Sequence, residues 1–166
     1  MPFACPFRRY VRSPSRLAIS IGLCFIPAVA GWLFTAPAIG SWYRTLNKPW
    51  FTPPDWVFGP VWTVLYLLMG ICLYRIWMHE NHKDLRLPVA LFSIQLTLNA
   101  LWSFLFFGLR APILGLFGII LLWFTILATI VAIYPVDRKA AYDLIPYILW
   151  VTLAAALNFA VYVLNP

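Results

Sequence analysis

The stretch from Trp42 to Tyr66 reads WYRTLNKPWFTPPDWVFGPVWTVLY and contains four tryptophans, two tyrosines and four prolines. It passes directly into an apolar run that ends near Trp77. Each proline fixes its own φ angle and pushes the preceding residue towards extended geometry, so residues 48–49 and 52–54 fit neither a helix interior nor a flexible tether. The sequence therefore predicts a restrained aromatic loop that leads into a membrane helix.

The rings of this stretch have two interpretations. Indole and phenol groups favour the boundary between membrane and water, so an interfacial aromatic belt explains the rings. A belt does not explain the prolines. A stiff aromatic loop that caps a cavity between helices explains both features.

The composition excludes an ordinary soluble protein. The chain has 166 residues, the length of one domain, of which 63% are hydrophobic and only 10% are charged. The net charge is +7, but the basic residues are scattered between apolar runs, so no nucleic-acid partner is indicated. Cys5, Cys24 and Cys72 show no paired spacing, which indicates packing residues and neither disulfides nor a metal site.

The apolar runs predict an all-α membrane protein with five spanning helices. The expected helices cover about 17–38, 57–77, 88–107, 112–134 and 142–164. Residues 1–16 form a basic extension with four arginines and no acid, and residues 17–166 form the membrane domain. Small residues at 28–30 resemble a signal-peptide cleavage site, but the apolar run continues to Ile39, which favours a retained first helix. An organellar transit peptide stays open as a further alternative.

Basic residues predict the orientation, because lysine and arginine are retained on the cytoplasmic side. Nine of the 12 lie in the N-terminal segment and in the second and fourth loops. In a bacterial inner membrane the N-terminus would therefore face the cytoplasm and the aromatic loop the outer side. In a mitochondrial outer membrane this rule is a weaker guide.

The third helix contains the most informative polar residues. Gln95, Asn99 and Ser103 recur at a spacing of four and share one face, with Trp102 and Phe106 beside it. Polar side chains in lipid face the bundle interior, so these groups line a binding site. The alternative is that the amides only bond neighbouring helices, at about 0.6–2 kcal/mol each.

Two further helices have aromatic stripes that end in small or amide residues. The second helix offers Trp62, Tyr66 and Gly70. The fifth offers Tyr147, Trp150, Ala154 and Leu157 or Asn158. Rings stack on the faces of a flat ligand and amides bond its edge, so this lining suits a planar, mostly apolar molecule.

Several catalytic signatures are absent from the sequence. It contains no HExxH, GxSxG, P-loop or CxxC motif, and we expect no acidic residue within a spanning run. These absences argue against a hydrolase, a metal site and a proton relay. We expect no required cofactor.

Three stretches resemble the TspO/MBR family of tryptophan-rich sensory proteins, which are related to the translocator protein or peripheral benzodiazepine receptor. They are WYRTLNKPWFTPPDWVFGPVWTVLYLLMG, QLTLNALWSFLFF and LIPYILWVTLAAALNF. The resemblance covers nearly everything from Trp42 to Tyr162, and the first stretch is highly specific.

The resemblance implies a five-helix bundle, often a homodimer, that binds protoporphyrin IX, haem and synthetic isoquinoline carboxamide and benzodiazepine ligands. It maps the family pocket onto Tyr43, Trp50, Trp62, Asn99, Trp150, Ala154 and Leu157. Some members also bind sterols. The sterol signature needs a basic residue soon after a C-terminal aromatic, whereas Tyr162 is followed only by VLNP.

Three functions follow as hypotheses. The leading one is a membrane receptor or sensor that binds porphyrins in a pocket under the aromatic loop and is linked to tetrapyrrole metabolism or stress responses. The second is an enzyme that degrades bound porphyrin with light or an oxidant, using Trp62 and Trp150. The third is porphyrin or sterol transport, which the lack of inverted repeats and broken helices disfavours.

Overall fold

The computed structural model describes residues 13–79 and 85–166, and every regular element within them is helical. The elements are α1 (Pro14–Ile39), α2 (Trp42–Thr45), α3 (Asp55–Trp77), α4 (Arg86–Ser103), η3 (Phe104–Gly108), α5 (Pro112–Ile133), α6 (Arg138–Asp143) and α7 (Ile145–Leu164). The π-helix η3 continues α4, and α7 continues α6, so five segments are long and apolar enough to cross a membrane. The predicted all-α architecture with five spans is confirmed.

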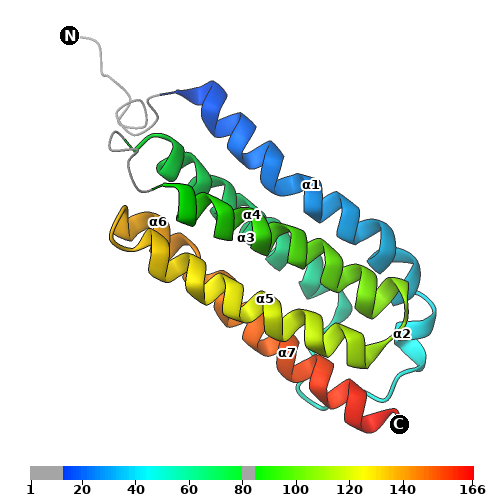
Figure 1. Ribbon diagram of the computed structural model, residues 1–166. Coiled ribbons are helices and arrows are strands. Elements are labelled where there is room, and N and C mark those ends of the chain that lie inside the picture. Colours follow the sequence, from blue (N-terminus) through cyan, green and yellow to red (C-terminus); the bar gives the residue numbers. More distant parts are fainter. Residues whose placement is uncertain (1–12, 80–84) are drawn as a thin grey trace.

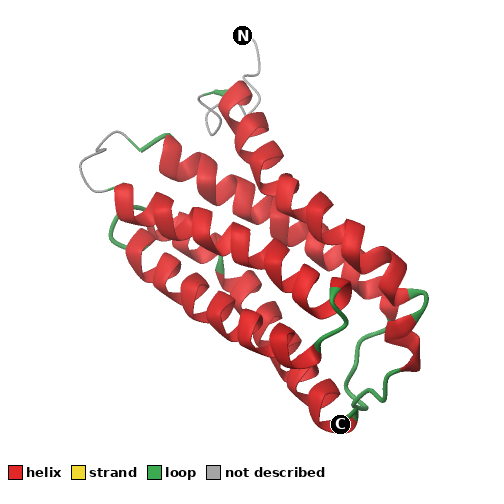
Figure 2. Cartoon of the chain, turned by 45° about the vertical axis from the view of Figure 1, so that its right-hand side comes forward, coloured by secondary structure: helices red, strands yellow, loops and turns green. Residues whose placement is uncertain are grey.

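The five long segments lie side by side in one bundle (Figure 1). α1 packs against α3 and α4, α5 packs against α4 and α7, and α6 packs against α3. The aromatic loop, which includes α2, lies at the same end of the bundle as the C-terminus (Figure 2). The start of α1 and the end of α7 lie at opposite ends, as five spans require.

Several spans begin a few residues earlier than predicted, and in two of them a side chain caps the first turn. α1 begins at Pro14, where the Ser13 hydroxyl accepts a hydrogen bond from the Arg16 amide and proline suits the first helical position. α6 begins at Arg138, because the Asp137 carboxylate accepts hydrogen bonds from the amides of the next turn at 2.8 and 3.1 Å. α1 then continues unbroken through residues 28–30 to Ile39. Most of the predicted basic extension lies outside the described residues.

The prediction that spanning runs contain no acid is wrong. Asp55 opens α3 and Asp143 ends α6, and both lie within spanning segments. The Asp143 carboxylate lies 3.0 Å from the Arg75 guanidinium on α3. Pairing with a cation offsets the free-energy cost of placing a carboxylate within a membrane-spanning segment. The same ion pair connects α6 to α3.

The outer surface of the bundle is apolar. Trp32, Phe117, Val131 and Leu149 are each more than 60% exposed, and they come from three different spans. Exposing such an apolar surface to water costs free energy, whereas contact with lipid chains does not. Together with the five apolar helices, this surface identifies an integral multi-pass membrane protein.

Cys24 in α1 and Cys72 in α3 are fully buried and free. Both pack in the hydrophobic core, as predicted for them from their spacing. Cys5 lies outside the described residues.

Candidate ligand-binding cavity

A cavity of about 520 Å³ lies between α1, α3 and α4, with α2 beside one end. Its lining comprises Phe25, Ala28, Val29, Gly31, Trp32, Thr35, Ala36, Ile39, Tyr43, Asp55, Phe58, Gly59, Trp62, Thr63, Tyr66, Asn99, Trp102, Ser103 and Phe107. Most of these groups are apolar or aromatic. Few side chains provide hydrogen bonds, so the position of each polar group matters.

Asn99 on α4 organises the deepest polar part of the cavity. Its carboxamide is 2% exposed and lies between two phenols from other helices. The Tyr66 hydroxyl on α3 donates to Asn99 Oδ1, and Asn99 Nδ2 donates to the Tyr147 hydroxyl on α7 at 3.0 Å. One amide thus joins three helices, and both of its ends have a hydrogen-bond partner.

The aromatic wall is built around Trp62 on α3. Its ring stacks on Tyr66 at a centroid distance of 5.6 Å and an interplanar angle of 30°. It also lies 6.5 Å from the Trp102 ring of α4 and 6.2 Å from the Tyr147 ring of α7. Contacts on several sides hold Trp62 in place, so the cavity has a preformed aromatic surface.

Trp102 is held by a second amide. Its indole N–H donates to Asn158 Oδ1 at 3.2 Å, and Asn158 Nδ2 donates to the Pro112 carbonyl at 2.8 Å. Asn158 therefore connects α4, α5 and α7 from behind the cavity wall. Its amide supports a wall residue and does not line the cavity itself.

Charged groups of both signs lie near the loop end of the cavity, where Asp55 belongs to the lining and Lys48 does not. Tyr43 on α2 is buried, and the Lys48 ammonium lies 4.3 Å from the centre of its ring. Burial and the nearby Asp55 carboxylate raise the pKa of Tyr43 to about 12. The phenol is therefore neutral at physiological pH, so Lys48 and Asp55 provide the formal charges near this end.

The loop is restrained by hydrogen bonds to itself and to the C-terminal end of α7. The Thr52 amide and hydroxyl both donate to the Pro49 carbonyl, at 3.1 and 2.7 Å. The Asn47 amide donates to Asn165 Oδ1 at 2.9 Å, and Asn165 Nδ2 donates back to the Asn47 carbonyl at 3.0 Å. These bonds give the proline-rich loop a defined shape.

Five of the residues predicted to bind ligand line this cavity together. They are Tyr43, Trp62, Tyr66, Asn99 and Trp102. Gln95 and Tyr147 are fully buried without lining the cavity, with Tyr147 behind Asn99 and Gln95 one turn before Asn99 on α4. Ala154 and Leu157 are buried on α7 without lining the cavity.

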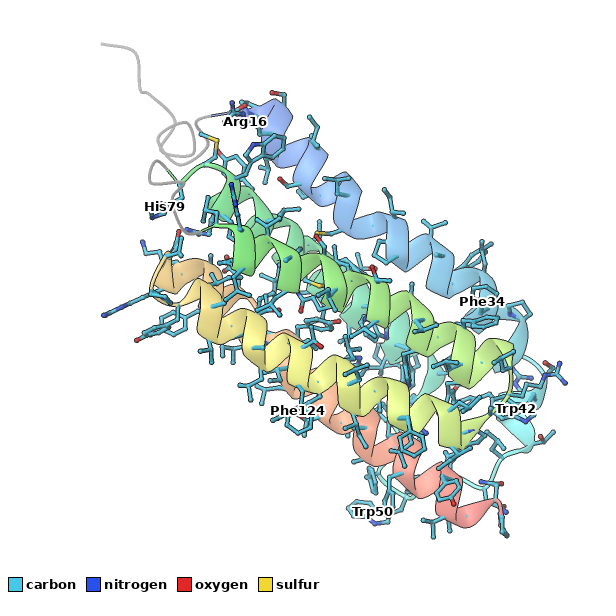
Figure 3. All side chains as sticks on the ribbon, viewed as in Figure 1. Arg16, Phe34, Trp42, Trp50, His79 and Phe124 are labelled. Carbon is cyan, nitrogen blue, oxygen red and sulfur yellow. The ribbon has the colours of Figure 1, made fainter. Side chains whose placement is uncertain are left out.

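Two other predicted residues lie elsewhere. Trp50 is 96% exposed, and its ring lies outside the helices (Figure 3). It occupies the turn closed by Pro49 and Thr52, which directs it away from the bundle. Trp150 lines a separate groove between α3 and α7, because the interior face of α7 is occupied by Tyr147, Val151 and Ala154.

The contribution of α1 to the cavity was not predicted from the sequence. Phe25, Ala28, Trp32, Thr35 and Ile39 recur at spacings of three and four and all line the cavity. That spacing marks one helix face and was available in the sequence. The stripe lacks charged and amide groups, so it was indistinguishable from an ordinary lipid-facing or packing surface.

Comparisons with known proteins agree with the architecture. Residues 20–164 match the TspO/MBR family. The chain is 47% identical to the tryptophan-rich protein TspO of Archaeoglobus fulgidus, over 90% of this chain and 97% of that protein. It is 37% identical to the protein CrtK of Rhodobacter capsulatus, over 90% and 92%, and 36% identical to the translocator protein of Sus scrofa, over 86% and 88%. The chain therefore belongs to the TspO/MBR family of membrane proteins.

Proposed function

We propose that the cavity binds a porphyrin, protoporphyrin IX or haem, and that the protein is a membrane receptor or sensor linked to tetrapyrrole metabolism or stress responses. The observation that carries the proposal is the aromatic wall of Trp62, Tyr66 and Trp102 beside the oriented Asn99 amide. Flat rings offer stacking surfaces to a flat macrocycle, and an amide offers hydrogen bonds to its polar edge.

The size and chemistry of the cavity support this ligand class. A volume of about 520 Å³ lies within the range of about 300–1,000 Å³ typical of small-molecule sites. Exposed residues of α1, Val29 and Trp32, contribute to the lining, so the cavity borders the apolar outer surface. A ligand dissolved in the bilayer would have direct access between α1 and α3.

The charges near the loop add a second recognition element. Lys48 lies against the ring of Tyr43, which lines the cavity. We assign its ammonium to a porphyrin propionate, since an ammonium and a carboxylate form a charge-assisted hydrogen bond.

The names of relatives agree with a sensing role without defining the ligand. One relative, 35% identical over 87% of this chain, is the tryptophan-rich sensory protein of Cereibacter sphaeroides. The homodimer and sterol binding implied by the resemblance stay predictions.

Titration of the detergent-purified protein with protoporphyrin IX tests the proposal. Porphyrin absorbance and tryptophan quenching would be followed for the wild type, for Trp62→Phe, and for the Trp62→Phe, Asn99→Ala double variant. We expect saturable binding that weakens at least tenfold in the double variant, about 1.4 kcal/mol. Trp123→Phe is the matched control, because it removes one indole from outside the cavity.

A ligand control separates Lys48 from the ring contacts. Lys48→Gln should weaken protoporphyrin IX about three- to tenfold and leave its dimethyl ester unaffected, because the ester has no carboxylate to pair. Equal binding of protoporphyrin IX to the wild type and the double variant would overturn the proposed site. Loss of binding in Trp123→Phe as well would point to a general effect on folding.

The stacked Trp62 and Tyr66 rings favour one second candidate, light-dependent porphyrin degradation with oxygen as the oxidant. Both residues are redox-capable and line the same cavity. A protein-dependent product spectrum under illumination, lost in Trp62→Phe at saturating porphyrin, would support this activity. Equal products in both proteins would indicate photobleaching alone.

We also propose that the end of the bundle near the start of α1 faces the cytoplasm in a bacterial inner membrane. Arg16 lies 5.4 Å from the Trp77 ring and Arg138 lies 5.3 Å from the Tyr134 ring, a pairing typical of an interfacial belt on the positive side. Labelling of single cysteines at Ser15 and Asn47 with an impermeant maleimide would test the orientation. Labelling of Ser15→Cys in intact cells would contradict it.

A further inference from the structure

The described lining of the inner cavity contains one formally charged side chain, that of Asp55. The other lining residues are apolar, aromatic or neutral and polar. Lys48 lies on the ring of Tyr43 near the same end, but it does not belong to the lining. The formal charge of the lining is therefore negative, and it lies at the loop end of the cavity.

The Asp55 carboxylate differs from the other described acids in having no partner. Asp143 forms an ion pair with Arg75 at 3.0 Å, and Asp137 caps the first turn of α6. The Asp55 side chain has neither an ion pair nor a hydrogen bond within the described part of the chain, although it lies at the start of α3, where the helix dipole favours a negative charge. Both of its oxygens are therefore available to a ligand.

Aromatic rings extend the cavity from this carboxylate. The charged and aromatic lining residues of α3 recur at spacings of three and four, so they share one face of the helix. They are Asp55, Phe58, Trp62 and Tyr66. Burial and the Asp55 carboxylate both raise the pKa of Tyr43, so this phenol lies within electrostatic range of the carboxylate. Aromatic rings attract organic cations, and a carboxylate beside them adds the opposite charge.

We propose that the loop end of the cavity binds an organic cation, in which a quaternary or protonated ammonium group is attached to an apolar body. The Asp55 carboxylate attracts the ammonium group, and the ring of Phe58, one turn further along α3, contacts its substituents. Because Lys48 already lies on the ring of Tyr43, the cation is assigned to Phe58. The apolar body lies against the remaining lining. The assignment does not rest on the proposed porphyrin site, since it uses a different charged group and a ligand without carboxylates.

Isothermal titration calorimetry of the detergent-purified protein tests the proposal with two matched probes. The first is biphenyl with a trimethylammoniomethyl substituent, whose charge does not depend on pH. The second is its neutral isostere, in which carbon replaces nitrogen to give a neopentyl group. Asp55→Asn keeps the shape of the side chain and removes its charge. We expect it to lower the affinity for the cation about three- to fivefold and to leave the affinity for the isostere unaltered.

Two further variants complete the experiment. Asp137→Asn makes the same change of charge at the opposite end of the bundle and keeps an acceptor that caps α6, so it should bind both probes as the wild type does (Figure 1). Phe58→Leu keeps an apolar side chain but loses the ring. It should lower the affinity for the cation about two- to threefold more than the affinity for the isostere.

Three results would overturn the proposal. Unaltered affinity for the cation in Asp55→Asn would exclude the carboxylate, and an equal loss for both probes would show that its charge is not recognised. An equal loss for the cation in Asp137→Asn would assign the effect to the charge of the whole protein. Equal losses for both probes in Phe58→Leu would overturn the assignment of its ring.

Discussion

The inner cavity and the outer groove are built from similar residues but differ in how their polar groups are satisfied. In the cavity wall Asn99 bonds two tyrosines, and Trp102 bonds Asn158. In the groove the Trp150 indole has no partner among the described residues. The cavity wall is thus held by bonds within the protein, whereas the buried indole N–H of Trp150 has no such bond. This contrast predicts a different response of each site to removal of its polar group.

The largest expected effect is that of Asn99→Leu. The substitution leaves the Tyr66 and Tyr147 hydroxyls buried without their shared partner, at about 1–3 kcal/mol each. We expect the free energy of unfolding in a dodecyl sulfate titration to fall by about 2–4 kcal/mol. Gln95→Leu is the control one turn away, since neither amide atom of Gln95 has a partner in the described structure, and it should be neutral or stabilising. Equal losses in both variants would refute the distinction between satisfied and unsatisfied amides.

Gly70→Ala should have the next largest effect, because it separates the helices that border the cavity. A Cβ atom at Gly70 would lie 2.7 Å from the Cα atom of Ile21 on α1, and that backbone atom cannot move aside without shifting the helix. We expect a loss of about 1–3 kcal/mol in the free energy of unfolding, as for other overpacked cores. Gly22→Ala is the matched control, since no atom lies within 4 Å of a Cβ atom there. A stable Gly70→Ala variant would show that α1 and α3 adjust at little cost.

A smaller effect is expected for Trp102→Phe. The change keeps an aromatic ring in the wall and removes the hydrogen bond to Asn158, whose amide still donates to the Pro112 carbonyl. We expect a loss of about 1 kcal/mol in the free energy of unfolding, measured in the same titration. A loss as large as that of Asn99→Leu would mean that Asn158 organises the wall as strongly as Asn99 does.

The smallest effect on stability is expected for Trp150→Phe in delipidated protein. The indole donor is already unpaired there, so its removal should change the free energy of unfolding by less than about 0.5 kcal/mol or raise it slightly. A large loss would imply that the N–H has an acceptor within the protein, and the contrast between the two sites would disappear.

Local sequence patterns determined the class and much of the cavity. Five apolar runs of spanning length, the proline-rich loop and the recurrence of Gln95, Asn99 and Ser103 were sufficient to predict a helical membrane bundle with a polar face on the third helix. These features depend on residues close together in the chain. The helical period of 3.6 residues and the thickness of the bilayer determine these features before the helices pack against one another.

The tertiary structure decided which faces meet. It gave α1 a whole side of the cavity, placed Trp150 in a separate groove, and left Trp50 exposed. It also paired Asp143 with Arg75, an acid not expected within a span. Helical periodicity defines a face but not its neighbour. Which helix packs against that face depends on how the helices rotate and cross. The close contact of Gly70 with Ile21 and the hydrogen bonds of Asn99 set this geometry, and they exist only in the assembled bundle.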